Sequence, residues 1–575
     1  MEAWFDRFPG RLEWELEQFV GRGLRFALDE DELRANGRIL LRGAIGHADR
    51  RLELEVLYPD LFPYLRPEVF ASGLELERHQ NPFERNLCLL DRSTREWNPS
   101  ESGAWLVAER VPKLLDLIAA GGEELKRGEI AQGEPISAYF PPEPGTVVFV
   151  PTEALQVDPA ARAGSGRLSF SPRIPPAIHI RALLSELAVQ GHGRKPRAAA
   201  RAADSLRAKF AGPTVPMRWV RVERPPLDRS PQALLEAAEA LKPGFGSPPW
   251  HSVAGGQIAV TGVVFREEVA QGRWEDAWLF AVKLRQEGPP GVREAAYVTR
   301  GERLTPSDLA SRLPPRARLD QATLAIIGTG ALGAPIALEC ARAQAAELRL
   351  LDHDQVEVGN TVRWPYGLST VAHHKVDVLS DYIDVDFAFT SVTVARQQIG
   401  ASALARSHRT ESEFDALARL LDGTDLVVDA SAEIGIQQLI SELADERGLA
   451  QIFVTATEGA RGGVVARVIP EQTGCWFCLQ LGIDDGTIPA PARDEAATVQ
   501  PRGCSSRTFT GANFDLLPIV SQALRAITAT VNFDDGQSRG PDVFVCSLPD
   551  DGLGAPTWVQ GRIEPHARCP RCSAS

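Results

Sequence analysis

The stretch from residue 324 to residue 375 constrains the fold of this chain more than any other. It opens with an apolar run, which leads into a turn that contains Gly328, Gly330 and Gly333. A helical pattern of apolar residues comes next, and a second apolar run ends at Asp352. A strand, a glycine turn, a helix and a strand that closes on an acid form the layout of the Rossmann nucleotide-binding unit.

The glycines allow a tight turn and let backbone N–H groups approach a phosphate at the N-terminus of the helix. Asp352 follows about 20 residues later, where a carboxylate accepts hydrogen bonds from a ribose hydroxyl. An NAD-dependent oxidoreductase would show the same pattern.

The residues after Asp352 favour a different chemistry from hydride transfer. Asn360 offers a neutral donor, and Arg363 and Lys375 offer two cations. An enzyme that splits ATP needs such groups, because charge builds on the α-phosphoryl group and on the leaving pyrophosphate. The chain contains no GxxxxGK[ST] sequence, which excludes a Walker-type site.

This order of motifs resembles the ThiF/MoeB-type adenylyltransferases, the superfamily that includes the ubiquitin-activating enzymes. The resemblance implies an ATP site in which Asp352 binds the ribose. The phosphates would be contacted by Asn360, Arg363 and Lys375.

The resemblance also implies Mg²⁺, but the chain departs from the family's pattern at the metal. The aspartate that usually helps to hold the ion would fall at Ala432, shortly after Asp429, the acid that ends the next core strand. Either Asp429 or Glu433 replaces it, or the metal is held differently.

Two Cys-x-x-Cys pairs, far apart in the sequence, are the second strong pattern. They are Cys475 with Cys478 and Cys569 with Cys572. Four thiolates form a closed tetrahedral set for structural Zn²⁺, which would pin the C-terminal end of the chain onto its domain. A redox role needs one accessible pair rather than two.

Cys504 lies between the two pairs, beside Arg502 and Arg507 and ahead of a helix expected to begin near Gly511. These electropositive surroundings favour a thiolate. The matching region of ubiquitin-activating relatives is a mobile loop with the catalytic cysteine, so the resemblance implies that Cys504 forms the first thioester. A loop thiol without a role is the alternative.

The first 130 residues carry another order of motifs. A helical pattern over residues 2–20 and three strand-like runs lead to a proline-punctuated loop, then to His79-Gln80-Asn81, Cys88 and a final helix. This order resembles a ubiquitin-conjugating enzyme domain, although Gln80 replaces the proline of the family's His-Pro-Asn. The resemblance implies that Cys88 takes an acyl group as a thioester, and that Asn81 orients the loop or stabilises the oxyanion. A small buried hydrophobe is the alternative for Cys88.

The sequence predicts a multidomain α/β protein. An α+β domain of the ubiquitin-conjugating type takes residues 1–130, and a Rossmann-like adenylation domain with a zinc knuckle takes residues 316–575. Proline-rich stretches mark the region between them, residues 131–315, which we expect to be an α/β linker domain or a degenerate adenylation-like domain. Residues 194–210 have the pattern of a basic helix.

The composition excludes several classes of protein. A net charge of −14 over 575 residues argues against nucleic acid as the main partner. The N-terminus lacks the features of a signal peptide, and no apolar run approaches the roughly 20 residues of a membrane helix. The cysteines suit a cytosolic chain that uses thiols for metal binding and chemistry, so we expect the cytoplasm. Cys340 and Cys546 are expected in the core.

The two resemblances together indicate a bacterial-style fusion of a ubiquitin-conjugating domain with a ubiquitin-activating domain, as in anti-phage (CBASS) operons. The C-terminal carboxylate of a ubiquitin-like or other protein would attack the α-phosphate of ATP. Cys504 would then displace AMP, and the acyl group would pass to Cys88 and on to an amine, such as a lysine, of a target protein. Two cysteines in one chain make the handover intramolecular. Relatives of the activating domain are commonly homodimers, so we expect a dimer.

Three other functions stay open. A sulfur-carrier-type adenylyltransferase would use the N-terminal fold only to dock a partner and would form no thioester on Cys88. An NAD-dependent oxidoreductase would bind a dinucleotide and leave Asn360, Arg363 and Lys375 unexplained. A non-catalytic scaffold, suggested by the missing metal aspartate, would show no ATP–pyrophosphate exchange.

Overall fold

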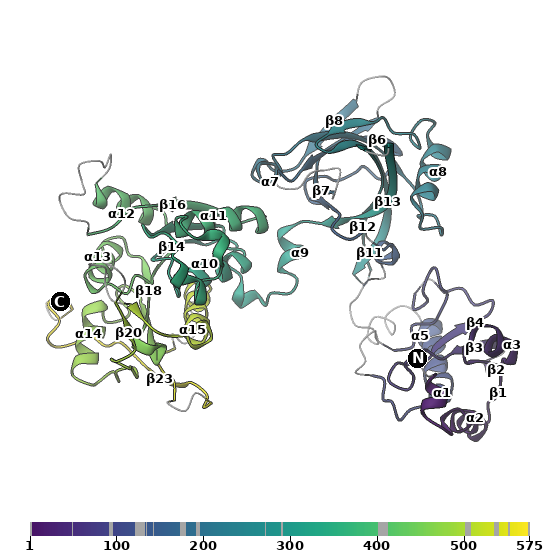
Figure 1. Ribbon diagram of the computed structural model, residues 1–575, viewed down its shortest axis with the longest axis horizontal. Helices are drawn as coiled ribbons and strands as arrows, with labels where there is room; N and C mark the ends of the chain where they lie inside the picture. The colour runs from purple at the N-terminus through teal and green to yellow at the C-terminus, as the bar shows by residue number, and fades with distance from the viewer. Residues whose placement is uncertain are drawn as a thin grey trace. The chain divides into compact units, whose positions relative to one another are not determined.

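The chain divides into two compact units, one with residues 1–202 and 210–303, the other with residues 203–209 and 304–575. Figure 1 shows both in the computed structural model. The structure describes residues 3–48, 50–76, 78–90, 96–120, 133, 135–141, 143–172, 180–190, 196–270, 272–288, 291–400, 412–500, 508–533, 540–549 and 553–572.

The unit with residues 304–575 is built on one sheet, whose described strands run in the order β16-β15-β14-β17-β18-β19-β22-β23. β16 to β18 are parallel, and the three strands after β18 are antiparallel. Their bounds are β14 (Thr323–Ile327), β15 (Glu347–Leu351), β16 (Ser391–Ala395), β17 (Leu426–Asp429), β18 (Ala450–Ala456), β19 (Gly462–Val468), β22 (Val543–Ser547) and β23 (Thr557–Gly561). The strand order reverses beside β14, and open parallel sheets bind ligands at the carboxyl ends of the strands next to such a switch point.

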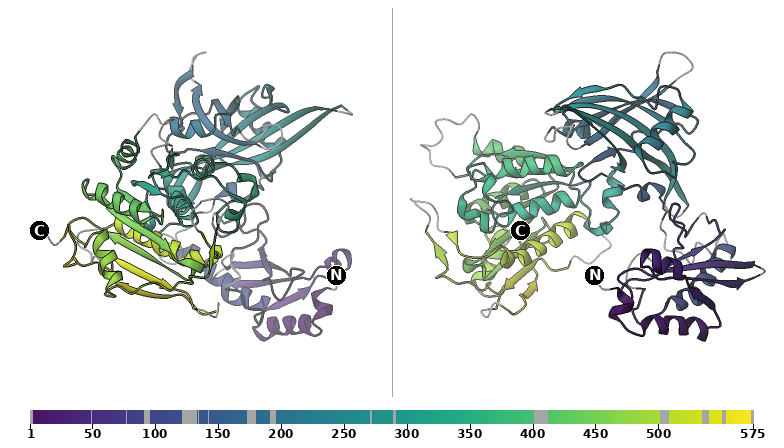
Figure 2. Two further views of the ribbon diagram at one scale, coloured as in Figure 1. Left: turned by 60° about the vertical axis from the view of Figure 1, so that its left-hand side comes forward. Right: turned by 45° about the vertical axis from the view of Figure 1, so that its right-hand side comes forward.

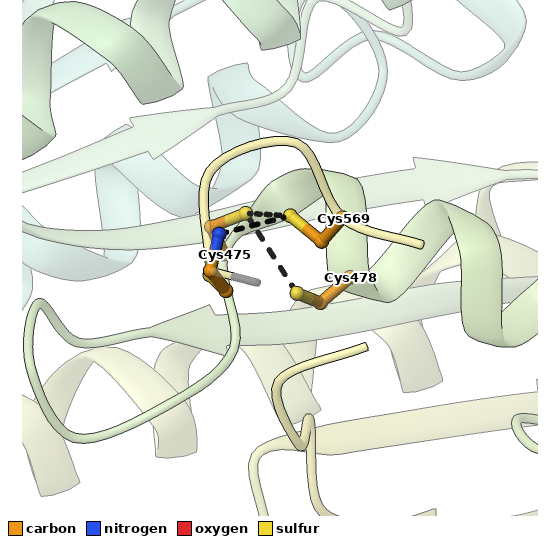
Figure 3. A group of neighbouring side chains, drawn as sticks. Cys475, Cys478 and Cys569 are labelled. Carbon is orange, nitrogen blue, oxygen red and sulfur yellow. Dashed lines mark hydrogen bonds between the residues drawn. The ribbon is translucent and has the colours of Figure 1, made fainter. Parts of the chain in front are cut away.

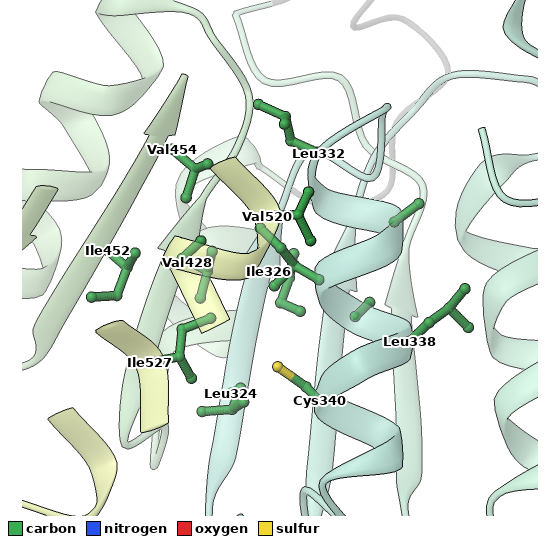
Figure 4. Close-up of a cluster of buried hydrophobic side chains, with 14 of the residues drawn as sticks. Leu324, Ile326, Leu332, Leu338, Cys340, Val428, Ile452, Val454, Val520 and Ile527 are labelled. Atoms are coloured by element: carbon green, nitrogen blue, oxygen red, sulfur yellow. The ribbon is translucent and has the colours of Figure 1, made fainter. Parts of the chain in front are cut away.

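Alternate residues of β14 bury the two faces of this sheet. Leu324 and Ile326 face one layer of helices, whereas Ala325 and Ile327 face the other. The first layer holds α10 (Gly333–Arg342), α11 (Lys375–Asp386) and α15 (Asn513–Val531), and the second holds α12 (Glu413–Leu421) and α13 (Ile434–Asp445). Figure 4 shows Ile326 in the first layer, between α10 and Val520 of α15, and Figure 2 gives two further views of the sheet. Strands buried on both faces explain the continuous apolar runs in the sequence.

Among the described residues one helix, α15, is long and apolar enough to cross a membrane by length and composition alone. No such segment was expected from the sequence. One face of α15 is buried against the sheet and α10 through Leu516, Ile519, Ala523 and Ile527. This is the pattern of a core helix in a globular domain.

A closed β-barrel occupies the middle of the chain, in the unit with residues 210–303. Its described strands follow one another in the order β9-β11-β12-β13-β5-β7-β6, and β6 pairs back with β9, which completes the ring seen in teal in Figure 1. The bounds are β5 (Val147–Val150), β6 (Ala163–Phe170), β7 (Arg181–Gln190), β9 (Thr214–Arg221), β11 (Gly256–Ala270), β12 (Arg273–Gly288) and β13 (Gly291–Arg303), with β8 (Pro196–Arg201) and β10 (His251–Val253) paired outside the ring. Residues from all around the ring form one core with Trp219, Trp278 and Phe280, and α8 (Pro231–Leu241) packs on a second apolar surface.

This barrel corrects two expectations for the middle region. Its architecture is one sheet closed on itself rather than the layers of an α/β domain. The basic helix expected over residues 194–210 is also wrong, because Pro196–Arg201 form strand β8 and the helix α7 covers only Asp204–Lys209. Hydrogen bonding of β8 to β7 outweighs the helix propensity of its alanines.

The N-terminal part of the same unit has an antiparallel sheet, β1 (Arg25–Leu28), β2 (Leu40–His47), β3 (Arg50–Leu57) and β4 (Glu68–Ala71). The helices are α1 (Trp4–Arg7), α2 (Arg11–Gly21), α3 (Glu30–Asn36), α4 (Gly103–Trp105) and α5 (Val111–Ala120). The expected order of a helix, three strands and a final helix is therefore present, with β4 and α3 in addition.

A buried carboxylate ties three segments of this part together. Glu15 of α2 is fully buried and accepts hydrogen bonds of 2.8 Å from the hydroxyl of Tyr58 and from the N–H of Gly103. Arg11 pairs with the same carboxylate. Burial raises the pKa of Glu15, and the hydrogen bonds act against that shift. A buried charge of this kind is tolerated only because every donor is in place.

Replacing Tyr58 with phenylalanine removes one of these donors and should loosen α2. We expect the free energy of local opening at α2 to fall by about 1–3 kcal/mol, the cost of losing a hydrogen bond to a charged group. Native-state hydrogen exchange of the full chain measures this opening. Tyr64→Phe, at a largely exposed tyrosine, is the control, and an equal effect of both variants would contradict the role given to Glu15.

Candidate functional site

The glycine turn joins the end of β14 to the start of α10. Gly328 has a φ of +81°, in the left-handed region that glycine adopts at little cost. A Cβ atom on Gly333 would lie 1.9 Å from the carbonyl oxygen of Gly328, so no side chain fits there. A Cβ atom on Gly330 would meet no atom within 4 Å, which leaves space over the backbone at the start of α10.

Asp352 follows β15 and braces this turn. Its Oδ2 accepts hydrogen bonds from the N–H and the hydroxyl of Thr329, at 2.7 and 3.0 Å. Its Oδ1 accepts a hydrogen bond of 2.9 Å from the N–H of Asp354. A carboxylate has about four lone-pair sites, so Asp352 retains capacity for a ribose hydroxyl while it fixes the turn.

Lys375 is the first residue of α11 and is buried. Its ammonium donates a hydrogen bond of 2.8 Å to Oδ2 of Asp354, and its backbone N–H donates one of 3.0 Å to the carbonyl oxygen of the same residue. Burial acts to raise the pKa of Asp354, but the hydrogen bond and charge of Lys375 lower it below its usual value. An ammonium has three N–H donors, so Lys375 can bind an anion without leaving Asp354.

Asn360 and Arg363 lie in and just after the short 3-10 helix η4 (Val358–Val362). The side-chain oxygen of Asn360 accepts a hydrogen bond of 2.9 Å from the N–H of Glu357 and so caps this turn. The guanidinium of Arg363 donates to the carbonyl oxygen of Phe509 at 2.5 Å and to the hydroxyl of Thr508 at 2.6 Å. Burial lowers the pKa of Arg363.

Asp429 ends β17, directly beside the end of β14. Its Oδ1 accepts hydrogen bonds of 2.9 and 2.7 Å from the N–H and the hydroxyl of Ser431. Its Oδ2 is buried without a hydrogen-bond partner, and burial raises the pKa of this carboxyl to about 6. An orphaned buried carboxylate oxygen fits a cation, because carboxylate oxygens are the ligands that Mg²⁺ prefers. Glu433 is the N-cap residue of α13.

The structure therefore brings the glycine turn, Asp352, Lys375 and Asp429 to one edge of the sheet. It adds residues that sequence reasoning missed, which are Thr329, Asp354, Trp364 and Ser431. Asp354 could have been found, because it stands between Asp352 and the cations. The indole of Trp364 donates to the carbonyl oxygen of Thr329 at 2.9 Å, a contact without a local signal in the sequence.

The four cysteines of the two Cys-x-x-Cys pairs form one cluster, with all sulfur atoms within 4.8 Å of one another. Figure 3 shows three of them, where Sγ of Cys475 lies 3.5 Å from Sγ of Cys569 and 3.9 Å from Sγ of Cys478. α14 (Trp476–Asp484) and the strands β19 and β22 supply the apolar surroundings. The expected clustering is confirmed, and four closely spaced thiols have the donor set of a structural zinc site.

The remaining cysteines differ in exposure. Cys340 and Cys546 are buried, as expected, and burial raises the pKa of these thiols to about 12 and about 11, so they are poor nucleophiles. Cys88 is exposed, which excludes the alternative of a small buried hydrophobe. Cys504 lies outside the described residues.

A tight hairpin presents Cys88. Its backbone N–H donates to the carbonyl oxygen of His79 at 2.7 Å, and the N–H of Asn81 donates to that of Asn86 at 2.9 Å. Residues 79–81 therefore run beside the cysteine. The side-chain oxygen of Asn81 accepts hydrogen bonds from the N–H groups of Phe83 and Glu84, at 2.9 and 3.0 Å, so it holds the turn.

Comparisons with known proteins found a family model that matches the C-terminal part and relatives that match all or part of the chain. A sequence model of the ThiF family matches residues 308–532. The protein y4oA of Sinorhizobium fredii is 32% identical over 603 aligned residues, which cover 100% of this chain and 98% of y4oA. The adenylyltransferase and sulfurtransferase MOCS3 of Culex quinquefasciatus is 29% identical over 126 residues, which cover 22% of this chain and 26% of MOCS3.

Among solved structures, Escherichia coli MccB with ATP has a TM-score of 0.32 and 15% sequence identity, over 45% of this chain and 68% of that one. The full-length match and the ThiF match rest on sequence and lead to one conclusion. The chain belongs to the same family as y4oA, and its C-terminal part is an adenylyltransferase domain of the ThiF/MoeB type.

Proposed function

We propose that the site at the carboxyl edge of the sheet activates the C-terminal carboxylate of a protein with ATP. The observation that carries this proposal is the buried ammonium of Lys375, held beside the glycine turn by Asp354. A carboxylate oxygen of the substrate attacks the α-phosphorus, the bond to the leaving pyrophosphate breaks, and an acyl-adenylate forms. Positioned cations favour this step because they stabilise the charge on the phosphates.

Each residue of the edge has a role in this proposal. Asp352 binds the ribose, and the phosphates lie over Gly330, between Lys375 and Arg363. Asn360 completes the phosphate contacts. Oδ2 of Asp429 is the oxygen available to Mg²⁺, which would neutralise charge on the phosphates when bound.

The second part of the proposal is a relay of thioesters. The thiolate of Cys504 attacks the carbonyl carbon of the acyl-adenylate and AMP leaves. The thiolate of Cys88 then takes the acyl group from Cys504, and an amine of a target protein finally displaces Cys88. The exposure of Cys88 supports this order, because a thiol that receives and passes on an acyl group has to be accessible.

The partners follow from this chemistry. They are a ubiquitin-like protein that presents its C-terminus, a target protein with an amine, and a second copy of the chain in a homodimer. We also propose that the protein acts in the cytoplasm and has a role in bacterial defence. Both rest on the resemblance of the two domains to ubiquitin-like conjugation enzymes.

A sulfur-carrier-type adenylyltransferase is the second candidate. The similarity of part of the chain to MOCS3 favours it. It shares the adenylation step but ends in sulfur transfer, without a thioester on Cys88.

A thioester trap separates these two functions. The full chain is incubated with ATP, Mg²⁺ and a ubiquitin-like protein that has a free C-terminus, and gels are run with and without reductant. We expect an adduct that reductant removes, that is absent in Cys504→Ala and that stays on Cys504 in Cys88→Ala. Exchange of pyrophosphate into ATP without any adduct would rule out the relay and leave the second candidate.

A pair of glycine variants tests the nucleotide site. Gly330→Ala adds a methyl group in open space, so the melting temperature should stay unchanged. The Kd for ATP should rise by about tenfold or more, because this methyl group would occupy the space of a phosphate. Gly333→Ala forces a collision with the Gly328 carbonyl and should lower the melting temperature by several degrees. Calorimetry of ATP binding and thermal melting give both values. A Gly330→Ala variant that binds ATP like the wild type would place the phosphates elsewhere.

We also propose that the four-cysteine cluster binds Zn²⁺ as a structural ion. Purified protein should contain about one zinc per chain, and Cys569→Ser should lose it together with order at the C-terminal end, because a closed site needs all four ligands. Metal analysis of the full chain measures the content. Cys546→Ser changes a buried thiol outside the cluster and should keep the ion. Zinc retained in Cys569→Ser would refute the assignment.

A further inference from the structure

Arg363 holds the base of a small hairpin. The hairpin consists of β20 (Thr498–Val499) and β21 (Thr508–Phe509), which pair in antiparallel fashion. The guanidinium of Arg363 donates to both residues of β21 and lies 4.6 Å from the centre of the Phe509 ring. This arginine, expected at the ATP phosphates, thus anchors a different part of the domain.

Arg363 precedes a residue whose side chain is anchored to the glycine turn. The neighbouring Trp364 is buried, and its indole N–H donates to the carbonyl oxygen of Thr329, between Gly328 and Gly330. A long, flexible side chain that starts one residue away can therefore reach either the hairpin or a phosphate at the turn.

We propose that Arg363 exchanges its hydrogen bonds to β21 for hydrogen bonds to the phosphates when ATP binds. This inference rests on the proposed function. The acceptors on β21 are a carbonyl and a hydroxyl, both neutral. Hydrogen bonds from a guanidinium to a phosphate oxygen are charge-assisted and stronger, and their planar, two-pronged geometry matches the guanidinium. The guanidinium of Arg363 therefore binds the phosphates of ATP, and the hairpin loses its two hydrogen bonds from Arg363.

The exchange makes Arg363 a positioning residue for the hairpin as well as a phosphate contact. In sequence, β20 and β21 bracket Cys504, the proposed acceptor of the acyl group. Arg363 then anchors β21 when no nucleotide is bound and releases it while ATP or the adenylate is bound.

Two threonine variants, one in β21 and one directly after it, test the exchange. Thr508→Val removes an acceptor of Arg363 and keeps the shape of the side chain. Thr510→Val is the matched control, because the hydroxyl of Thr510 donates to the carbonyl oxygen of Ala497 within the hairpin. Both variants loosen the hairpin, but only the first frees the arginine.

The measurements are the Kd of Mg·ATP for the full chain, by calorimetry, and hydrogen exchange at the amide of Thr510, which donates to Ala497 at 2.9 Å. Thr508→Val should bind ATP about three- to tenfold more tightly, the equivalent of one competing hydrogen bond. Thr510→Val should leave the Kd unchanged. In the wild type, ATP should speed exchange at Thr510, whereas in Thr508→Val the exchange should be fast already.

The results that would contradict the exchange differ from those that would contradict the proposed function. ATP binding with the same or a higher Kd in Thr508→Val, or wild-type exchange at Thr510 that ATP does not speed, overturns the exchange and leaves the proposed function intact. If Thr508→Val fails to fold, the wild-type exchange experiment decides alone. A wild type that does not bind ATP overturns the proposed function, and this inference with it.

Discussion

The contact between Gly333 and the carbonyl oxygen of Gly328 sets the position of everything at the carboxyl edge of the sheet. α10 can start this close to β14 only because Gly333 has no side chain that would collide with this oxygen. Thr329, between the two, donates its N–H to Asp352 and accepts at its carbonyl oxygen from Trp364. The turn is therefore rigid before any ligand arrives, which is the condition for backbone donors to stabilise a charge without reorganising.

The cations Lys375 and Arg363 both have hydrogen-bond partners, but the partners differ in charge. Lys375 is paired with a carboxylate and retains donors for a ligand, so it can serve without moving. Arg363 is paired with two neutral acceptors on β21. The difference decides which group is fixed and which is exchangeable, because a phosphate competes far better with a carbonyl than with an ion pair. In the proposed exchange, Lys375 is the cation that stays in place and Arg363 is the cation that moves.

The sequence was informative where structure depends on neighbours along the chain. The glycine turn, Asp352 and Lys375 lie within one βαβ unit and its continuation, so their spacing already predicts that they meet. The contact of Arg363 with Thr508 could not be predicted, since it joins segments that are distant in sequence and form no repeated pattern. The barrel was missed for the same reason, because its closure depends on the pairing of β9 with β11. Strand β8 shows that pairing with a neighbouring strand can also override a correct local propensity.

The family's metal-binding aspartate would fall at Ala432, and the backbone of this residue has an unusual conformation. Ala432 has a φ of +61°, a left-handed conformation that costs an alanine about 1–2 kcal/mol and that aspartate adopts more readily. The turn keeps this shape because Ser431 bonds Asp429 on one side and accepts from the N–H of Glu433 on the other, and because it packs against Gly328. The turn therefore holds a left-handed residue at position 432, where the family's pattern has an aspartate and this chain has an alanine. The carboxylate oxygen without a hydrogen-bond partner belongs to Asp429, three residues earlier. Burial raises the pKa of this carboxyl to about 6, because surroundings of low dielectric constant disfavour its charged form.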